Sequence, residues 1–394
     1  MTKVRMIGLV CLLALSATLW AQDPTVLVES YRRNFARASL ATKLDLLQEA
    51  AAFQNMGPLY ETALQFVLDN ASLLQTDVLL RDISILSVNM LRQFQQSSAA
   101  GLLMNLFKSY RETAVRVPVL QALSELGAGN KPLLAELNNV LDTQNSLFSS
   151  GVPADNQVLD ALIFTIGQLG DASSFRVLFS AFIAGYSRGI SASAVAAMAN
   201  LDGDFGNYLT GVIQDEPVAT KLSALQVGLS GDALPAEQRG ALAEAALLVS
   251  VTTQPASNAD QQALSGLAVL AARELTRLGW QRASTIAVRH FYDFQTRFNR
   301  NQITKSDFLE AVALLGAMGT AEAAQALAIY LQLINTETEQ GSKTYDEQIV
   351  LAVINNLGNL GDKAAFDYLL YVGYLQYSET IKRAARDALQ KLRW

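Results

Sequence analysis

The sequence predicts an all-α protein built from repeated pairs of helices. Apolar residues recur at helical spacing along most of the chain, and a period-two alternation with β-branched residues persists nowhere. A helix-ending mark recurs nine times between positions 57 and 361, and its eight intervals have a mean length of about 38 residues. A unit of that length holds two helices of roughly 12–15 residues and two turns. Hydrophobic residues make up 51% of the 394 residues, which is enough for a large core.

The mark is a glycine, usually in a Leu-Gly pair, that follows an apolar helical stretch. Glycine at this point can adopt the left-handed conformation that ends a helix. Asp171 and Asp362 directly follow two of the marks, where a carboxylate oxygen can cap the next helix. Gln95 fits the spacing without being a glycine. We place the marks at Gly57, Gln95, Gly127, Gly170, Gly203, Gly231, Gly279, Gly319 and Gly361.

The N-terminal segment, residues 1–21, has the pattern of a secretory signal peptide. Lys3 and Arg5 precede an almost wholly apolar stretch, Met6–Trp20, and Ala21 is a small residue before the expected cleavage point. We therefore predict an exported protein that is periplasmic or extracellular. A transmembrane anchor is the alternative, but about 15 apolar residues fall short of the roughly 20 that a span needs.

Cysteine and histidine usage narrows the chemistry that the chain can perform. The sequence contains one cysteine, Cys11, and one histidine, His290. Lipidation at Cys11 is disfavoured because Val10, rather than a small residue, precedes it. Cysteine and histidine zinc sites, iron–sulfur clusters and multi-histidine metal centres are excluded by number. We therefore expect no cofactor and no catalysis, and an enzyme on the same frame is the least favoured alternative.

The charge balance argues against nucleic acid and anionic membranes as partners. Beyond residue 21 the chain has 28 basic and 36 acidic residues, a net charge of −8. Both of these partners bind basic surfaces. No later stretch approaches about 18 uncharged apolar residues, so we expect no membrane span after the signal peptide.

The C-terminal residues show one helix pair most completely. Ala364–Gln376 predicts a first helix, Tyr377–Glu379 a turn, and Ile381–Leu392 a second helix. In the second helix a basic pair precedes small residues and a leucine-containing end, at Lys382, Arg383, Ala384, Ala385, Ala388 and Leu389. This arrangement resembles the HEAT-repeat family of armadillo-like α-solenoids, in a secreted bacterial type.

The resemblance implies a right-handed α-solenoid of about eight to nine HEAT-like helix pairs over residues 22–394. The clearest units are 158–203, 304–361 and 362–394. Tetratricopeptide units keep a fixed length of about 34 residues and armadillo units carry a third helix, so both fit the varying intervals less well. The resemblance supports a fold and no particular activity.

Four longer polar segments fall at the predicted turn between the two helices of a unit, at residues 142–157, 252–262, 293–305 and 335–348. In the predicted phase they share one edge of the stack, which faces solvent or a partner. Drift in unconstrained loops is the alternative explanation, and the arginines near residue 297 also fit the solvated face of an amphipathic helix. Because aromatic and arginine side chains anchor interfaces, we predict partner binding at Phe148, Arg297, Phe298, Arg300 and Tyr345.

A stack of helix pairs presents side chains from successive units on one preformed surface. We therefore predict a non-catalytic protein-binding scaffold of the cell envelope. A structural envelope component, acting as a spacer or a homo-oligomer, is the alternative.

Overall fold

A computed structural model describes residues 24–231 and 233–393. These residues form twenty α-helices, five short 3₁₀ helices and no strand, which confirms the all-α prediction. The predicted signal peptide, residues 1–21, lies outside the described residues. Within the described part, no helix combines the length and the apolar character needed to span a bilayer.

The described chain divides after Gly203 into two compact units. One continuous array over residues 22–394 stays a prediction. Unit 1 contains α2 (Pro24–Arg37), α3 (Leu40–Ala50), α4 (Gly57–Asp69), η1 (Ala71–Leu73), α5 (Val78–Gln93), η2 (Ser97–Ala99), α6 (Ala100–Ser109), α7 (Thr113–Leu126), α8 (Lys131–Ser149), α9 (Asn156–Leu169), η3 (Ala172–Ser174), α10 (Phe175–Ile183) and α11 (Arg188–Ala199). Unit 2 contains α12 (Phe205–Asp215), α13 (Val218–Gly228), α14 (Ala236–Thr252), α15 (Asn258–Leu278), η4 (Gln281–Ala283), α16 (Ser284–Asn299), α17 (Lys305–Met318), α18 (Ala321–Glu339), α19 (Glu347–Leu360), η5 (Lys363–Ala365), α20 (Phe366–Val372) and α21 (Glu379–Gln390).

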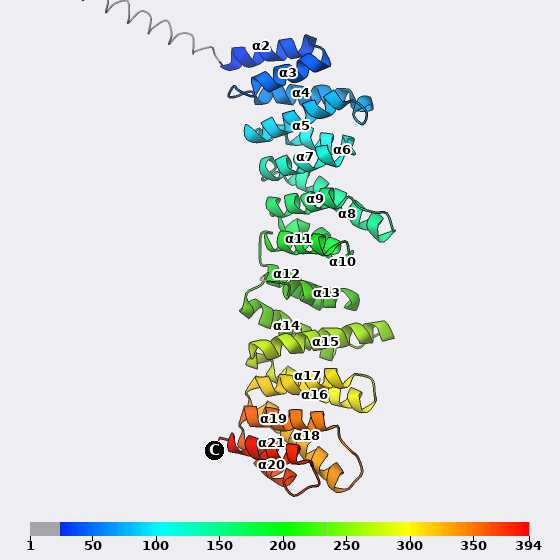
Figure 1. Cartoon of the computed structure of the whole chain (residues 1–394), viewed down its shortest axis with the longest axis vertical. Helices are drawn as coiled ribbons and strands as arrows, with labels where there is room; N and C mark the ends of the chain where they lie inside the picture. Colours follow the sequence, from blue (N-terminus) through cyan, green and yellow to red (C-terminus); the bar gives the residue numbers. More distant parts are fainter. Residues whose placement is uncertain (1–23, 232, 394) are drawn as a thin grey trace, which may run out of the picture. The chain divides into compact units, whose positions relative to one another are not determined.

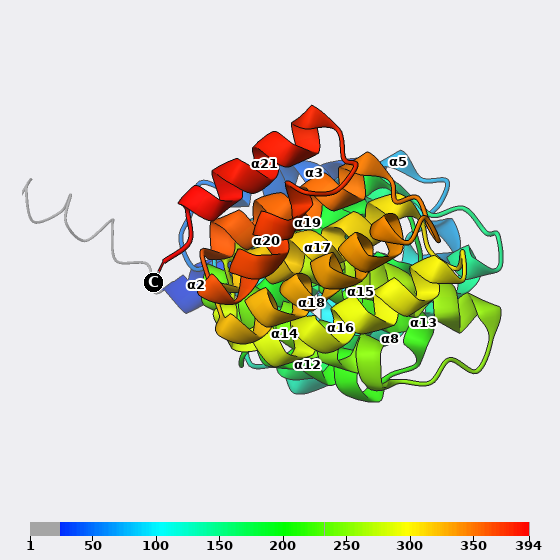
Figure 2. The ribbon, with the colours of Figure 1, turned by 90° about the horizontal axis from the view of Figure 1, so that it is seen from below.

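The helices of each unit form two layers. Odd-numbered helices contact one another in series, as α5, α7, α9 and α11 do in unit 1, and even-numbered helices form the second layer (Figure 1). Figure 2 shows α17, α19 and α21 in one layer of unit 2 and α16, α18 and α20 in the other. Apolar side chains fill the space between the layers. In unit 2, for example, the buried rings of Phe291 on α16 and Phe308 on α17 stack with their centroids 5.8 Å apart.

Seven of the nine predicted marks have positive φ, and four of them are the C-caps of helices. Gly170, Gly279, Gly319 and Gly361 are left-handed C-caps with φ between 59° and 72°, and the marks at 95, 203 and 231 also have positive φ. Gly127 ends α7 as predicted, but the left-handed residue is Gly129. The mark at 57 is wrong by two positions, because Gly57 begins α4 and the left-handed residue is Asn55. The predicted caps are confirmed, since the carboxylates at 171 and 362 accept backbone amides of η3 and η5.

Unit 2 repeats unit 1 helix for helix, α2 to α11 matching α12 to α21. In unit 1, the side chain of Asn145 on α8 donates to the carbonyl oxygen of Val177 and accepts from the hydroxyl of Tyr186, both at 3.1 Å. In unit 2, Asn335 on α18 donates to a carbonyl oxygen of α20 at 3.0 Å and accepts from the hydroxyl of Tyr377 at 3.1 Å. The same buried asparagine therefore joins the same helices in both units.

Equivalent positions toward the end of the two units are a constant number of residues apart. Gly170 and Gly361, which end α9 and α19, are separated by 191 positions (361 − 170). The backbone amides of Asp202 and Arg393 donate to the carbonyl oxygens of these two glycines, at 2.5 and 2.7 Å. Other pairs at this separation are Gly167 and Gly358, Asp171 and Asp362, and Ala197 and Ala388.

A buried lysine marks the start of both units. The ammonium of Lys43 on α3 donates to the C-terminal carbonyl oxygens of α2, at Phe35 and Ala38. Lys221 on α13 donates in the same way to Ile213 and Gln214 at the end of α12. A cation is favourable against the negative end of a helix dipole. The period near forty residues therefore lies within a larger repeat of ten helices.

Candidate functional site

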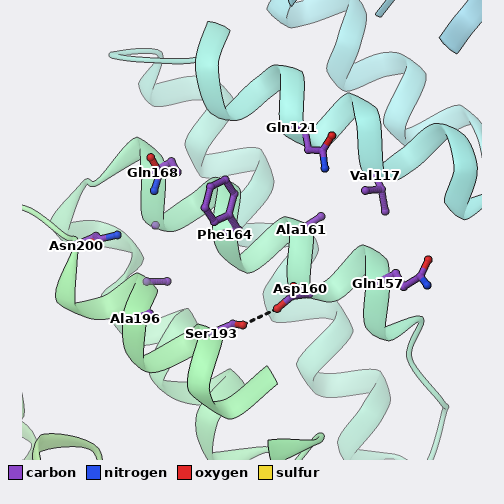
Figure 3. A pocket seen from close by; sticks show the side chains of 12 residues that line it. Val117, Gln121, Gln157, Asp160, Ala161, Phe164, Gln168, Ser193, Ala196 and Asn200 are labelled. Atoms are coloured by element: carbon purple, nitrogen blue, oxygen red, sulfur yellow. Dashed lines mark hydrogen bonds between the residues drawn. The ribbon is translucent and has the colours of Figure 1, made fainter. Parts of the chain in front are cut away.

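A groove of about 610 Å³ crosses the odd-numbered layer of unit 1, over α7, α9 and α11 (Figure 3). The helices supply the apolar part of its lining through small side chains and one ring. These residues are Val117, Ala161, Phe164, Ala196 and Ala197.

The local sequence of α9 fixes the central helix of the groove. The carboxylate of Asp155 caps its start by accepting two backbone amides, and Gly170 ends it. The hydroxyl of Thr113 donates to Asp155, and these bonds hold the pKa of that carboxyl below its usual value. Gly167 packs so tightly on α11 that a Cβ there would lie 2.7 Å from the Cα of Ala197. The floor of the groove therefore consists of closely packed backbone.

The polar lining of the groove carries negative charge and no positive charge. Asp160 on α9 accepts a hydrogen bond from the hydroxyl of Ser193 on α11, with 2.5 Å between Oδ1 and Oγ. No lysine or arginine belongs to the described lining. Side-chain amides, each with a donor and an acceptor, supply the remaining polar groups at Gln121, Gln157, Gln168 and Asn200.

Phe164 is the most conspicuous side chain of the groove. Its exposed fraction is 52%, although it lies at the middle of a regular helix. Figure 3 shows its ring among the other lining side chains. Large exposed aromatic side chains in a concave surface are characteristic of binding sites.

The equivalent face of unit 2 keeps the frame but has different side chains. Ala352, Gly358 and Ala388 repeat the small residues of the floor. Asp160, Phe164 and Ser193 correspond to Leu351, Asn355 and Ala384. The carboxylate–hydroxyl pair and the exposed ring therefore belong to unit 1 alone.

The predicted partner-binding aromatics lie half-buried against other residues of their own unit. Phe148 on α8 lies against Tyr186 with ring centroids 4.0 Å apart, and Phe298 on α16 stacks on Phe308 at 5.0 Å. Tyr345 donates its hydroxyl to Glu337, and burial together with that carboxylate raises the pKa of the tyrosine. These three rings are therefore engaged within the chain.

The predicted arginines are placed differently from each other. Arg297 is largely covered, donates to the hydroxyl of Ser265 and lies 3.4 Å from the carboxylate of Asp293. Arg300 is exposed just after the last residue of α16. Arg289, near the middle of the same helix, is also exposed. Phe148 belongs to unit 1 and the other four predicted residues belong to unit 2. A partner-binding role for these five residues stays a prediction.

The polar segments give shorter turns than expected. Helices α8, α16 and α18 extend to Ser149, Asn299 and Glu339, so much of each segment is helical. In unit 2 the turns α14–α15, α16–α17 and α18–α19 lie on one edge (Figure 1).

His290 is a core residue of α16 with an exposed fraction of 1%. Neither ring nitrogen has a hydrogen-bond partner among the described residues. Burial, with a smaller effect from Arg297, lowers its pKa to about 3. In the described part of the chain, no three or more histidine, cysteine or acidic side chains gather as metal ligands would.

No protein-family model matches the chain, and no curated protein matches it either. The groove is not evident from the sequence, because its side chains come from three separate helices. One signal was present in α9, where Asp160, Phe164 and Gln168 recur at i, i+4 and i+8. An aromatic residue on the polar stripe of an amphipathic helix points away from the core.

Proposed function

We propose that the protein is a non-catalytic protein-binding scaffold of the cell envelope, and that the groove on α7, α9 and α11 is its binding surface. The observation that carries the proposal is the exposed Phe164 inside a groove with an amide-rich lining. Protein interfaces combine an apolar anchor with a polar rim. The export part of the proposal rests on the sequence pattern of residues 1–21.

The fold part of the proposal is an α-solenoid of the HEAT type. It is supported by ten successive helices in two layers in each unit. Of the thirteen described residues with positive φ, nine fall between successive helix pairs, at positions 55, 95, 129, 170, 203, 231, 279, 319 and 361. The sequence predicted eight to nine pairs from the intervals between marks. Counting the helices before the first mark and after the last mark gives ten.

Site-directed crosslinking tests the proposal. A photo-crosslinking residue is placed at Gln121 or Gln168 in the groove and, for comparison, at Arg300 or Tyr345 in the turns. The chain from residue 22 onward is exposed to envelope extract, and the crosslinked protein is identified and purified. We expect crosslinks from the groove positions that Phe164→Asn weakens. Crosslinks from the turn positions alone would reject the groove and support the turns.

Self-association is a second candidate, favoured by one exposed cluster. Tyr374, just after α20, has an exposed fraction of 77%, and Leu370 has 42%. In unit 1 the equivalent of Leu370 is Phe179, which is 6% exposed. Exposed apolar clusters mark contact sites. Light scattering over a range of concentrations tests this candidate, and a mass that stays monomeric would reject it.

A further inference from the structure

We propose that the groove binds one extended segment of a partner polypeptide, which carries a lysine or arginine two residues from an apolar side chain. This inference rests on the proposed function and names the chemistry of the partner. It follows from the charge, the hydrogen-bonding groups and the spacing of the groove, and from the altered lining in unit 2.

The charge of the groove calls for a cation from the ligand. Ser193 holds one oxygen of the Asp160 carboxylate, and no lysine or arginine of the described chain pairs with the other oxygen. A carboxylate fixed in this way by a hydroxyl is positioned to accept a charge-assisted hydrogen bond. Complementary charge also selects among partners.

The amides of the groove favour a polypeptide over other cationic or neutral ligands. Gln121, Gln168 and Asn200 each present an N–H donor and a carbonyl acceptor. A peptide backbone supplies both complementary groups at every residue. A polyamine supplies no acceptor for the amide N–H groups, and a neutral oligosaccharide supplies no cation for Asp160. Either ligand leaves part of the lining unpaired, which costs binding free energy.

The spacing along α9 fits an extended segment. Asp160 and Phe164 are one helical turn apart, and residues at that spacing have Cβ atoms about 5–6 Å apart. Alternate side chains of an extended segment are separated by about 6.6–6.8 Å on one face. A basic and an apolar side chain two positions apart therefore reach Asp160 and Phe164 together. From Gln157 to Gln168, α9 rises about 16 Å, which matches roughly five extended residues.

Unit 2 provides a natural contrast on the same frame. At the positions of Asp160, Phe164 and Ser193 it has Leu351, Asn355 and Ala384, so the hydroxyl-bonded carboxylate and the ring are replaced. At the positions of Ala196 and Asn200 it has Asp387 and Lys391, so a cation faces the equivalent surface. The chain therefore has one such site, in unit 1. Because Leu351, Asn355 and Ala384 occupy equivalent positions on helices, we expect leucine, asparagine and alanine to be tolerated at positions 160, 164 and 193.

The test is a selection of short random peptides on the chain from residue 22 onward. The parallel selection uses the variant Asp160→Leu/Phe164→Asn/Ser193→Ala, which carries the side chains of unit 2 at these three positions. Enriched peptides are then measured by fluorescence anisotropy. We expect a shared pattern of Lys or Arg two positions from an apolar residue, and affinity lower by roughly tenfold or more in the variant. Replacing the basic residue of the peptide by glutamate should abolish binding to the unchanged chain.

A graft into unit 2 gives a matched gain of function. Leu351→Asp/Asn355→Phe/Ala384→Ser, combined with Asp387→Ala and Lys391→Asn so that the lining on α21 also matches that on α11, should raise the binding stoichiometry from one peptide per chain to two. Circular dichroism of each variant checks its fold, and the single variant Phe164→Asn repeats the test if the triple variant does not fold.

Three outcomes of the binding measurements would overturn the inference. They are enrichment of no peptide, enriched peptides without the basic residue, and maltohexaose binding that is lost in the unit 1 variant. The proposed function fails separately, because it requires only that a purified partner crosslinks in the groove. A partner that crosslinks there without the basic–apolar pattern leaves that function standing and removes this inference.

Discussion

His290 occupies a position that unit 1 fills with a leucine. Phe107 and Phe291 are equivalent, and the residues before them are Leu106 and His290, both buried. Each unpaired polar atom in a core costs about 1–3 kcal/mol. The histidine therefore stabilises unit 2 less than an apolar side chain of similar size would.

The substitution His290→Leu should stabilise the protein, and more so in mild acid. The folded-state pKa of about 3 lies below the unfolded value of about 6.5, so the unfolded state binds the extra proton between these values. Stability of the unchanged protein must then fall as pH falls through this range, by up to about 1.4 kcal/mol per pH unit. Urea unfolding near pH 7 and near pH 5 measures the difference, which should be about 1–3 kcal/mol at the higher pH and larger at the lower. Equal acid sensitivity in both proteins would contradict it, and Leu106→His should introduce the same sensitivity into unit 1.

At the level of single elements, helix ends were predictable from the sequence and side-chain exposure was not. A left-handed C-cap is a local requirement, so glycines such as Gly170 and Gly361 could be recognised directly. Gln95 shows that the position, rather than glycine, is required, since it has φ 52° where Gly279 has φ 59°. Phe148 and Phe298 were predicted to bind a partner, but they pack on Tyr186 and Phe308, which come from distant parts of the sequence that local pattern cannot reveal.

The close contacts between α9 and α11 and between α19 and α21 predict how much stability is lost when a methyl group is added to either glycine. In Gly167→Ala the new Cβ would lie 2.7 Å from the Cα of Ala197, and in Gly358→Ala it would lie 3.0 Å from the Cα of Ala388. Backbone cannot rotate away as a side chain can, so the helices must separate. Overpacking of this kind costs about 1–3 kcal/mol. Thermal unfolding should show a larger loss for Gly167→Ala than for Gly358→Ala, and a neutral effect of both would show that the helices adjust freely.

At the scale of the whole molecule, the repeat of ten helices could not be predicted from a single period near forty residues. Equivalent residues of the two units are 178 positions apart at Lys43 and Lys221 but 191 apart at Gly170 and Gly361 (221 − 43 and 361 − 170). The shift accumulates through turns and helices of unequal length, such as α4 and α14. Only shared contacts, such as those of the buried asparagines and lysines, reveal which positions correspond.

The two units should fold separately. Each has its own two-layer core, and chains of this length bury enough apolar surface to be stable alone. Residues 22–203 and residues 204–394, produced as separate chains, should each show helical circular dichroism and a cooperative unfolding transition. His290→Leu should then shift the transition of the second fragment and leave the first unchanged, because residue 290 belongs to unit 2. Two fragments that are both unfolded, while the intact chain folds, would mean that the ten-helix repeat is a feature of descent and not a unit of stability.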